Sequence, residues 1–286
     1  MGILAVVNQK GGVGKTTVAL GLASAAMMRG RRSLVVDMDP QANATTGLGV
    51  FDAGRTIDMV LAEDAPGAAA TAVRRSGWEP SVGHAPDLLP SSPRLAQCEH
   101  ELATDPIGAQ DRLRMALDGV ADRYDEVIID CPPSLGLLTV NALFAADRVL
   151  IVAEPAAWSI DGVEQILRNV RRIADRQSGR PAIAGIVVNR LARTRDGAYW
   201  HGQLGQTHGD LVLEPAIAMR AAVAEAAAQS LPIHLLRRDG ASDAGDQFAA
   251  LARALDGDRS APAVSSLTQP RIDLSVVGTS AGHSEL

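Results

Sequence analysis

The sequence predicts an α/β fold in which helices cover both faces of a mostly parallel, twisted sheet. Short apolar runs alternate along the chain with stretches of helical periodicity. A glycine-rich octet, KGGVGKTT at residues 10–17, lies between the first apolar run and the first helical stretch. Strands that alternate with helices form parallel sheets whose faces the helices cover. The chain has 286 residues, 47% of them apolar, which is enough for one large domain of this kind.

The strands and helices can be assigned from these two periodicities. Five apolar runs of strand length are predicted buried strands: 3–7, 33–36, 126–129, 148–153 and 183–188. Five stretches with helical spacing are predicted helices: 16–28, 135–145, 159–176, 217–229 and 242–256. Gly30 follows the first helix as a plausible C-terminal cap, and residues 41–120 are predicted to be helix-rich.

The composition divides the chain at about residue 256. Residues 1–256 are predicted to form the domain, whereas 257–286 are rich in Ser, Thr, Gly, Pro and Ala without sustained periodicity. Such a segment buries too little apolar surface to fold, so we expect a disordered tail. No apolar run is long enough to span a bilayer, and residues 1–8 lack the basic start of a signal peptide. We therefore expect a cytoplasmic protein.

The octet at 10–17 has the composition and context of a P-loop, so the fold class is a P-loop NTPase. Gly11, Gly12 and Gly14 lack Cβ atoms, which lets the backbone curl and direct N–H groups towards phosphate. The Lys15 ammonium neutralises β- and γ-phosphate charge, and the Thr16 hydroxyl is a ligand for Mg²⁺. The expected nucleotide-binding residues of the loop are Gly11, Gly12, Val13, Gly14, Lys15, Thr16 and Thr17.

The loop departs from the ordinary Walker A spacing. Gln9 stands where that pattern requires glycine, and Lys10 precedes the glycine pair instead. Lys10 and Lys15 are the only lysines among 27 basic residues. A compact ammonium fits beside phosphate in a tight loop where a forked guanidinium would clash. Both lysines are therefore predicted to face phosphate.

Three aspartates follow predicted strands, at the sheet edge where α/β proteins bind ligands. Asp130 comes after the run 127–129, and Asp37 and Asp39 come after the run 33–36. Asp130 and Asp39 are predicted to hold Mg²⁺ through water, and Asp39 or Asp37 to orient the attacking water. A single aspartate at a strand end is often only a helix cap or a turn residue. The combination with the P-loop favours the catalytic interpretation.

Three segments resemble the motifs of the ParA/MinD group of deviant Walker A ATPases in order and spacing. They are KGGVGKTT at 10–17, VVDMDPQANATTGLG at 35–49 and IIDCPPS at 128–134. The similarity extends to about residue 255 and is closest to ParA-type, Soj-like partition ATPases. Most members have glycine where this chain has Ala42.

The resemblance implies roles for residues inside and outside the loop. Lys10 would be the signature lysine, which reaches across an ATP-dependent homodimer to the partner's phosphates. Asp39 would position the hydrolytic water with support from Asp37. Asn189 would contact adenine, and the segment around Pro215 would wall the base.

Arginines are concentrated in one part of a chain whose net charge is −6. Residues 168–195 hold eight arginines and one acid, Asp175, which suits sequence-independent contact with DNA phosphates. A solvated helix face is the alternative. The resemblance implies DNA contacts by Arg193, Arg195 and Arg220. Because the P-loop begins at residue 10, we expect no N-terminal helix-turn-helix, and hence non-specific binding.

Other branches of the same group remain alternatives. MinD-like members end in a basic amphipathic helix, but the C-terminal segment RIDLSVVGTSAGHSEL has one arginine and no sustained apolar face. Iron–sulfur members need cysteines in glycine-rich surroundings, which Cys98 and Cys131 lack. A metabolic or assembly enzyme of the same fold also stays open.

These observations together predict an ATP- and Mg²⁺-dependent DNA partition ATPase. Its expected partners are a second copy of the chain, non-specific DNA and a ParB-type centromere-binding protein that stimulates slow hydrolysis, with no membrane. The expected location is the cytoplasm, on the nucleoid.

Overall fold

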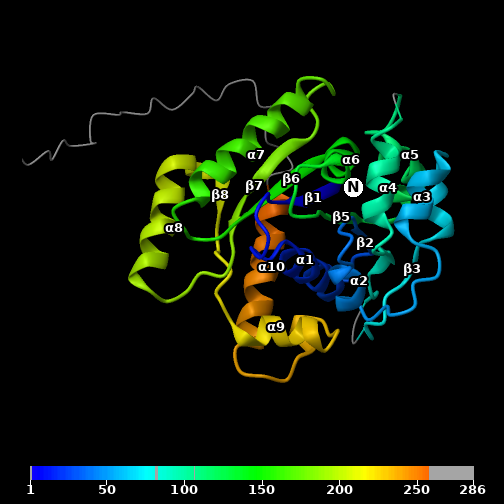
Figure 1. The fold of residues 1–286 in the computed structure, drawn as a ribbon. Coiled ribbons are helices and arrows are strands. Elements are labelled where there is room, and N and C mark those ends of the chain that lie inside the picture. Colours follow the sequence, from blue (N-terminus) through cyan, green and yellow to red (C-terminus); the bar gives the residue numbers. More distant parts are fainter. Residues whose placement is uncertain (1, 81–82, 106, 258–286) are drawn as a thin grey trace, which may run out of the picture.

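A computed structural model describes residues 2–80, 83–105 and 107–257 of the chain (Figure 1). Its centre is an eight-stranded sheet in the order β3-β4-β2-β5-β1-β6-β7-β8. The strands have the following bounds: β1 Ile3–Val7, β2 Ser33–Asp37, β3 Arg74–Arg75, β4 Asp87–Leu89, β5 Glu126–Asp130, β6 Arg148–Ala153, β7 Ala182–Val188 and β8 Val212–Leu213. Every pairing is parallel except that of β3 with β4. The predicted P-loop α/β class is confirmed.

Ten α-helices accompany these strands. Their bounds are α1 Lys15–Met28, α2 Asn43–Gly47, α3 Ile57–Glu63, α4 Leu95–Leu102, α5 Arg112–Ala116, α6 Leu137–Ala145, α7 Ser159–Ala174, α8 Arg195–His208, α9 Ala221–Ala228 and α10 Ala241–Gly257, all within the described residues. Helix α1 ends where Gly30 adopts φ 67°, and the next N–H, of Arg31, donates to the carbonyl of Ala26 at 3.0 Å. This pattern is the Schellman cap expected at Gly30.

Alternate side chains of each strand enter two separate cores, as the two-residue repeat requires. In β1, Leu4 and Val6 join one core with α1, α9 and α10, whereas Ala5 and Val7 join the other. The second core also receives α3 to α8 (Figure 1). Helix α10 packs so closely on α1 that a Cβ on Gly21 would overlap the ring of Phe248. Both faces of the sheet are therefore covered.

The five predicted strands are all present, within one residue of their predicted ends. Three short strands were missed, namely β3, β4 and β8, because each has only two or three residues and too little periodicity to detect. The predicted helix at 217–229 begins too early. Residues before α9 are extended, and the N–H of Ile217 donates to the carbonyl of Val188 at 2.8 Å beside the end of β7. The predicted tail, apart from Gly257 at the end of α10, lies outside the described residues.

Candidate nucleotide-binding site

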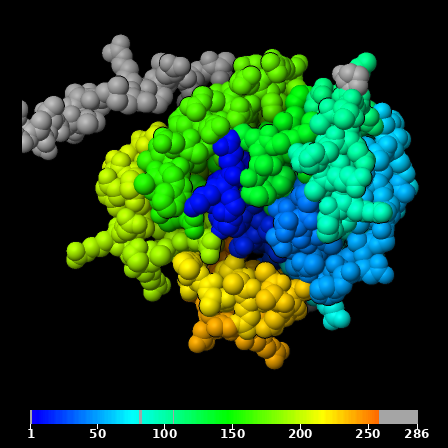
Figure 2. All heavy atoms as spheres, in the orientation of Figure 1, coloured from blue at the N-terminus to red at the C-terminus, as the bar shows by residue number. Residues whose placement is uncertain are grey.

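The P-loop connects β1 to α1 and lies at the carboxyl edge of the sheet. Gly12 and Gly14 have φ of 82° and 87°, a left-handed conformation that favours glycine. A Cβ on Gly14 would also overlap the amide of Asn189. The loop reaches the surface near the middle of the view in Figure 2, between the green central part of the chain and the yellow and orange C-terminal part. It is thus both tightly shaped and accessible to a ligand.

The end of β7 holds this loop through two consecutive residues. Asn189 is buried and donates from Nδ2 to the carbonyl of Val13 at 2.8 Å. Arg190 donates from Nη1 to the carbonyl of Gly12 at 2.6 Å, and its backbone has a left-handed φ of 59°. Such a conformation costs free energy in a residue other than glycine, and it places the arginine over the loop. Arg190 was not predicted as a site residue.

Asn189 and Pro215 lie on neighbouring strand ends. Val187 of β7 pairs with Leu213 of β8, so Pro215 lies just beyond the carboxyl end of the strand next to Asn189. The structure therefore brings both predicted base-contacting residues to the same edge of the sheet as the P-loop. Their contact with adenine stays a prediction.

Lys15 is buried at the start of α1. Its Nζ lies 3.5 Å from the carbonyl of Lys10, so the side chain folds back along the loop. Burial lowers the pKa of the Lys15 ammonium, while the nearby Asp130 opposes this shift. The neighbouring acids only partly offset the cost of burying this ammonium. An anion that enters the loop would therefore stabilise it.

Asp130 lies at the end of β5, completely buried beside the end of β2. Its Cα is in register with that of Asp37, and neither of its carboxylate oxygens accepts a hydrogen bond of good geometry. Burial and the charge of Asp37 raise the pKa of Asp130 well above its usual range, although the nearby Thr16 hydroxyl acts in the opposite direction. A buried carboxylate with unsatisfied oxygens is costly, so these oxygens suit contact with a cation or a water in its shell.

Asp37 and Asp39 have different partners although they are two residues apart. Asp37 accepts hydrogen bonds from the N–H and the hydroxyl of Thr45, at 2.8 and 2.7 Å, and from the N–H of Asp39 at 3.1 Å. Burial raises the pKa of Asp37 to about 6. One oxygen of Asp39 accepts the N–H of Gln41 at 2.9 Å. Asp37 thus anchors the turn that presents Asp39. In that turn Ala42 has φ 53°, at the position where the family usually has glycine.

The residues present fit an ATP·Mg²⁺ complex. The glycines leave room for phosphate, Lys15 is a buried cation, and Asp130 has unsatisfied oxygens beside the Thr16 hydroxyl. Hard oxygen ligands of this kind are those that Mg²⁺ prefers. Thr16 and the water-mediated carboxylates Asp130 and Asp39 would hold the ion.

Lys10 lies at the outer end of the loop, and two residues that were not predicted contact it. Its Nζ lies 3.4 Å from Oε2 of Glu154, which follows β6, and 4.2 Å from the centre of the Trp158 ring. The other oxygen of Glu154 lies 3.7 Å from Nη1 of Arg190. No motif marks Glu154 or Trp158 in the sequence. The one feature of the sequence that could have indicated Glu154 is its place directly after the apolar run 148–153.

The predicted DNA-binding arginines do not form one uniform patch. Arg193 lies between β7 and α8, and Arg195 is the first residue of α8; both are exposed. Arg220 is partly buried, and its Nη2 lies 3.0 Å from Oδ2 of Asp243. The two exposed arginines lie three and five residues after Arg190, which contacts the P-loop.

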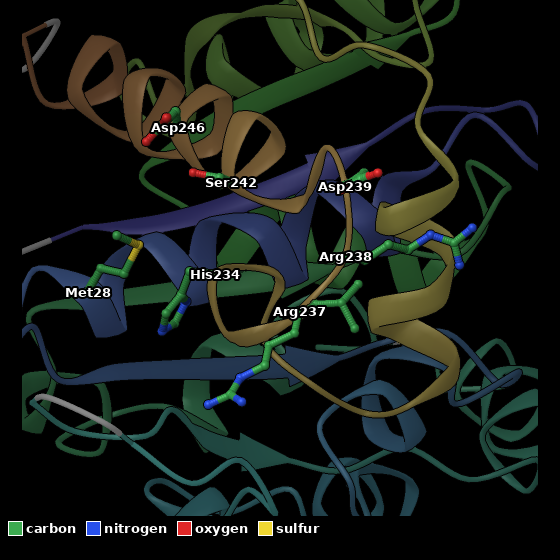
Figure 3. Close-up of a pocket in the computed structure, with 9 residues that line it drawn as sticks. Met28, His234, Arg237, Arg238, Asp239, Ser242 and Asp246 are labelled. Atoms are coloured by element: carbon green, nitrogen blue, oxygen red, sulfur yellow. The ribbon is translucent and has the colours of Figure 1, made fainter.

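A pocket of about 450 Å³ lies away from the P-loop, among α1, α10 and the segment between α9 and α10 (Figure 3). It is lined by Met28, His234, Leu236, Arg237, Arg238, Asp239, Ser242, Gly245 and Asp246. Arg237 and Arg238 extend away from each other in Figure 3, and Arg238 pairs with Glu225. Its two arginines and two aspartates balance, so its charge favours no ligand. None of the predicted nucleotide-site residues lines it.

The remaining features bear on the alternative branches. Cys98 and Cys131 are both buried as free thiols. No helix within the described ranges is both long and apolar enough to cross a membrane.

Comparison with known proteins defines first the class and then the family. A family model described as an AAA domain matches residues 1–183, which together with the P-loop geometry defines a P-loop ATPase. The sporulation initiation inhibitor protein Soj of Bacillus subtilis is 36% identical over 236 residues, covering 82% of this chain and 90% of Soj. The chromosome partitioning protein ParA of Caulobacter vibrioides is 35% identical over 239 residues, covering 82% and 86%. The chain belongs to the ParA/MinD family of ATPases, and a chromosome partitioning protein is among its relatives.

Two solved structures are similar in fold. Cobyrinic acid a,c-diamide synthase from Mycobacterium smegmatis, with a bound ATP analogue and magnesium, has a TM-score of 0.74 and 28% identity, covering 93% of this chain and 99% of that one. The cell division ATPase MinD of Pyrococcus furiosus has a TM-score of 0.70 and 25% identity, covering 89% and 98%. ATP and Mg²⁺ are therefore the cofactors of this chain, as predicted.

Proposed function

We propose that this chain is a DNA partition ATPase whose nucleotide state switches both self-association and DNA binding. One observation carries the proposal beyond family membership. Asn189 and Arg190 hold two P-loop carbonyls, and the same segment continues directly into the exposed Arg193 and Arg195. A change in the loop would therefore reach the arginines through a short, hydrogen-bonded connection.

The nucleotide site supplies positioning and charge for hydrolysis. Lys15 and the backbone N–H groups of the loop bind phosphate, and Thr16 and Asp130 hold the metal ion. When bound, Mg²⁺ neutralises charge that develops on the transferred phosphoryl group. Asp39, presented by the turn that Asp37 anchors, orients the attacking water. Hydrolysis by the chain alone is slow.

Lys10 makes the site incomplete in a single subunit. It lies exposed at the outer end of the loop beside Glu154, which suits a residue that reaches the partner's phosphates. Two copies then enclose two ATP molecules face to face. The homodimer forms with ATP and separates after hydrolysis.

DNA binding follows from pairing the two arginine surfaces. The exposed arginines of residues 168–195 contact phosphates without reading bases, so binding is non-specific and weakens with salt. Two weak patches on one dimer bind DNA far more tightly than either alone. ATP therefore raises the affinity for DNA.

The partner and the location follow from the relatives' roles. A ParB-type centromere-binding protein stimulates hydrolysis and resets the switch, and the ATP-bound chain resides on the nucleoid in the cytoplasm. The names of Soj and ParA, rather than the fold alone, favour this branch.

Co-sedimentation with non-specific DNA and with liposomes tests the proposal, each with ATP and with ADP. We expect sedimentation with DNA in ATP only, and its loss at high salt. Binding to liposomes without DNA would indicate a MinD-like positioning ATPase instead. Binding to neither would indicate a metabolic or assembly enzyme, as the name of the M. smegmatis structure suggests for that protein.

A further inference from the structure

Glu154 and the ring of Trp158 form a binding place for the Lys10 ammonium on its own subunit, here called the Lys10 clamp. The carboxylate is 3.4 Å from Nζ and the ring centre is 4.2 Å away. Both distances are within the range of an ion pair and a cation–π contact. The Lys10 side chain is still 45% exposed, so it is held but can leave.

The backbone of Lys10 is fixed independently of its side chain. Its N–H donates to Oδ1 of Asn8 at 2.6 Å, and its carbonyl lies 3.5 Å from Nζ of Lys15. Release from the Lys10 clamp therefore needs only side-chain rotation, without a rearrangement of the P-loop.

Glu154 is well supported in this position. It follows β6 directly, and Arg190, which donates to the carbonyl of Gly12, lies 3.7 Å from its other oxygen. Its carbonyl accepts a hydrogen bond from the Ser159 hydroxyl, which fixes the turn that carries Trp158. The carboxylate and the ring are thus held by the framework and not by Lys10.

We propose that Glu154, assisted by Trp158, is a positioning residue that retains Lys10 on its own subunit until ATP occupies the partner's site. This inference rests on the proposed function, in which Lys10 crosses to the partner. It adds that leaving the Lys10 clamp is a cost of dimer formation. A triphosphate offers Lys10 more negative charge than one carboxylate does, so the exchange is favourable with ATP and less so with ADP.

Removing the carboxylate charge should make dimers form more readily. An exposed ion pair of this kind shifts an equilibrium by up to about fivefold. Only the fraction of subunits whose Lys10 has left the clamp can dimerise, and the apparent affinity for dimer formation is reduced in proportion to that fraction. Because two lysines leave their clamps, the dimer dissociation constant should fall by up to about 25-fold, the square of the single effect.

The test measures dimerisation of the full chain by analytical ultracentrifugation in a slowly hydrolysed ATP analogue with Mg²⁺. Glu154→Gln should lower the dimer dissociation constant, and Trp158→Leu should lower it less. Asp175→Asn is the matched control, because this exposed acid loses the same charge at the end of α7 opposite to Trp158. Glu154→Asp keeps the charge and should return the constant towards that of the wild type.

A second readout separates positioning from structural damage. ADP binding to the monomer should be the same in the wild type and in Glu154→Gln, since Lys10 does not serve its own site. If the wild type forms no dimer with the analogue, the proposed function fails and the inference with it. Suppose instead that the wild type dimerises and Glu154→Gln keeps its ADP affinity. If its dimer dissociation constant is then unchanged or higher, only the inference is overturned.

Discussion

The nucleotide site and the arginine-rich segment at residues 168–195 hold their charges in opposite ways. At the nucleotide site, Lys15 and Asp130 are buried at fixed strand and helix ends, and each shifts the pKa of the other. In the arginine-rich segment, Arg193 and Arg195 are exposed to solvent, in the loop before α8 and at the first residue of that helix. Binding at the nucleotide site thus depends on the exact positions of a few charges, whereas binding by the arginine-rich segment depends on how many charges it carries.

This difference predicts how each region responds to mutation. Loss of a single buried charge at the nucleotide site removes a contact to phosphate or metal that no second residue replaces, so its effect on ligand binding should be large. Loss of an exposed arginine removes one phosphate contact of several and should be graded. The two regions meet at Asn189 and Arg190, so effects that cross between them measure their coupling.

Lys15→Ala should have the largest effect. The Lys15 ammonium would pair with phosphate in a buried site. Truncating one member of such a charge pair typically costs 2–5 kcal/mol, so affinity for ATP should fall at least about 30-fold, measured by isothermal titration calorimetry. Lys10→Ala is the matched control, because it should retain ATP binding while losing the dimer. ATP affinity within threefold of the wild type in folded Lys15→Ala would contradict the assignment of the site.

Asp130→Asn should act in two directions. Without nucleotide the chain should become more stable, by a few degrees in melting temperature, because a buried and unpaired carboxylate is replaced by a neutral amide. The additional stabilisation by ATP on adding Mg²⁺ should decrease, since a ligand of the ion's water shell is lost. Melting curves with and without ATP and Mg²⁺ measure both effects. An unchanged Mg²⁺ response would remove Asp130 from the metal site.

Replacing both Arg193 and Arg195 by Gln should weaken DNA binding moderately. Each lost phosphate contact should reduce the slope of log affinity against log salt by about one, with little change in ATP affinity. Arg94 and Arg123 replaced by Gln form the matched control, because both are exposed and the charge change is equal. Filter binding at several salt concentrations distinguishes the pairs, and equal losses would show that only net charge matters.

The sequence predicted the regions that have strong local patterns. The five long strands and the P-loop were found because apolar runs end at polar residues, and the sheet brings those ends to one edge. The contacts of Glu154 and Arg190 were not predicted, because they join strand ends that are far apart in sequence. The short strand β4 was missed because prolines flank its three residues and hide any alternation.

Replacing Arg220 should have the smallest effect on DNA binding, because Arg220 is held in an ion pair whereas Arg193 and Arg195 are exposed. Its ion pair with Asp243 already compensates its charge, so Arg220→Gln should weaken DNA binding only about twofold, less than either exposed arginine. Asp243→Asn makes the comparison decisive: it frees the guanidinium and removes a repulsive carboxylate, so affinity for DNA should rise. Fluorescence anisotropy with a short duplex in ATP measures both variants. The opposite result would be an unchanged DNA affinity in Asp243→Asn together with a loss of more than tenfold in Arg220→Gln. Arg220 would then leave Asp243 on binding DNA, and the ion pair would belong to the DNA-free state.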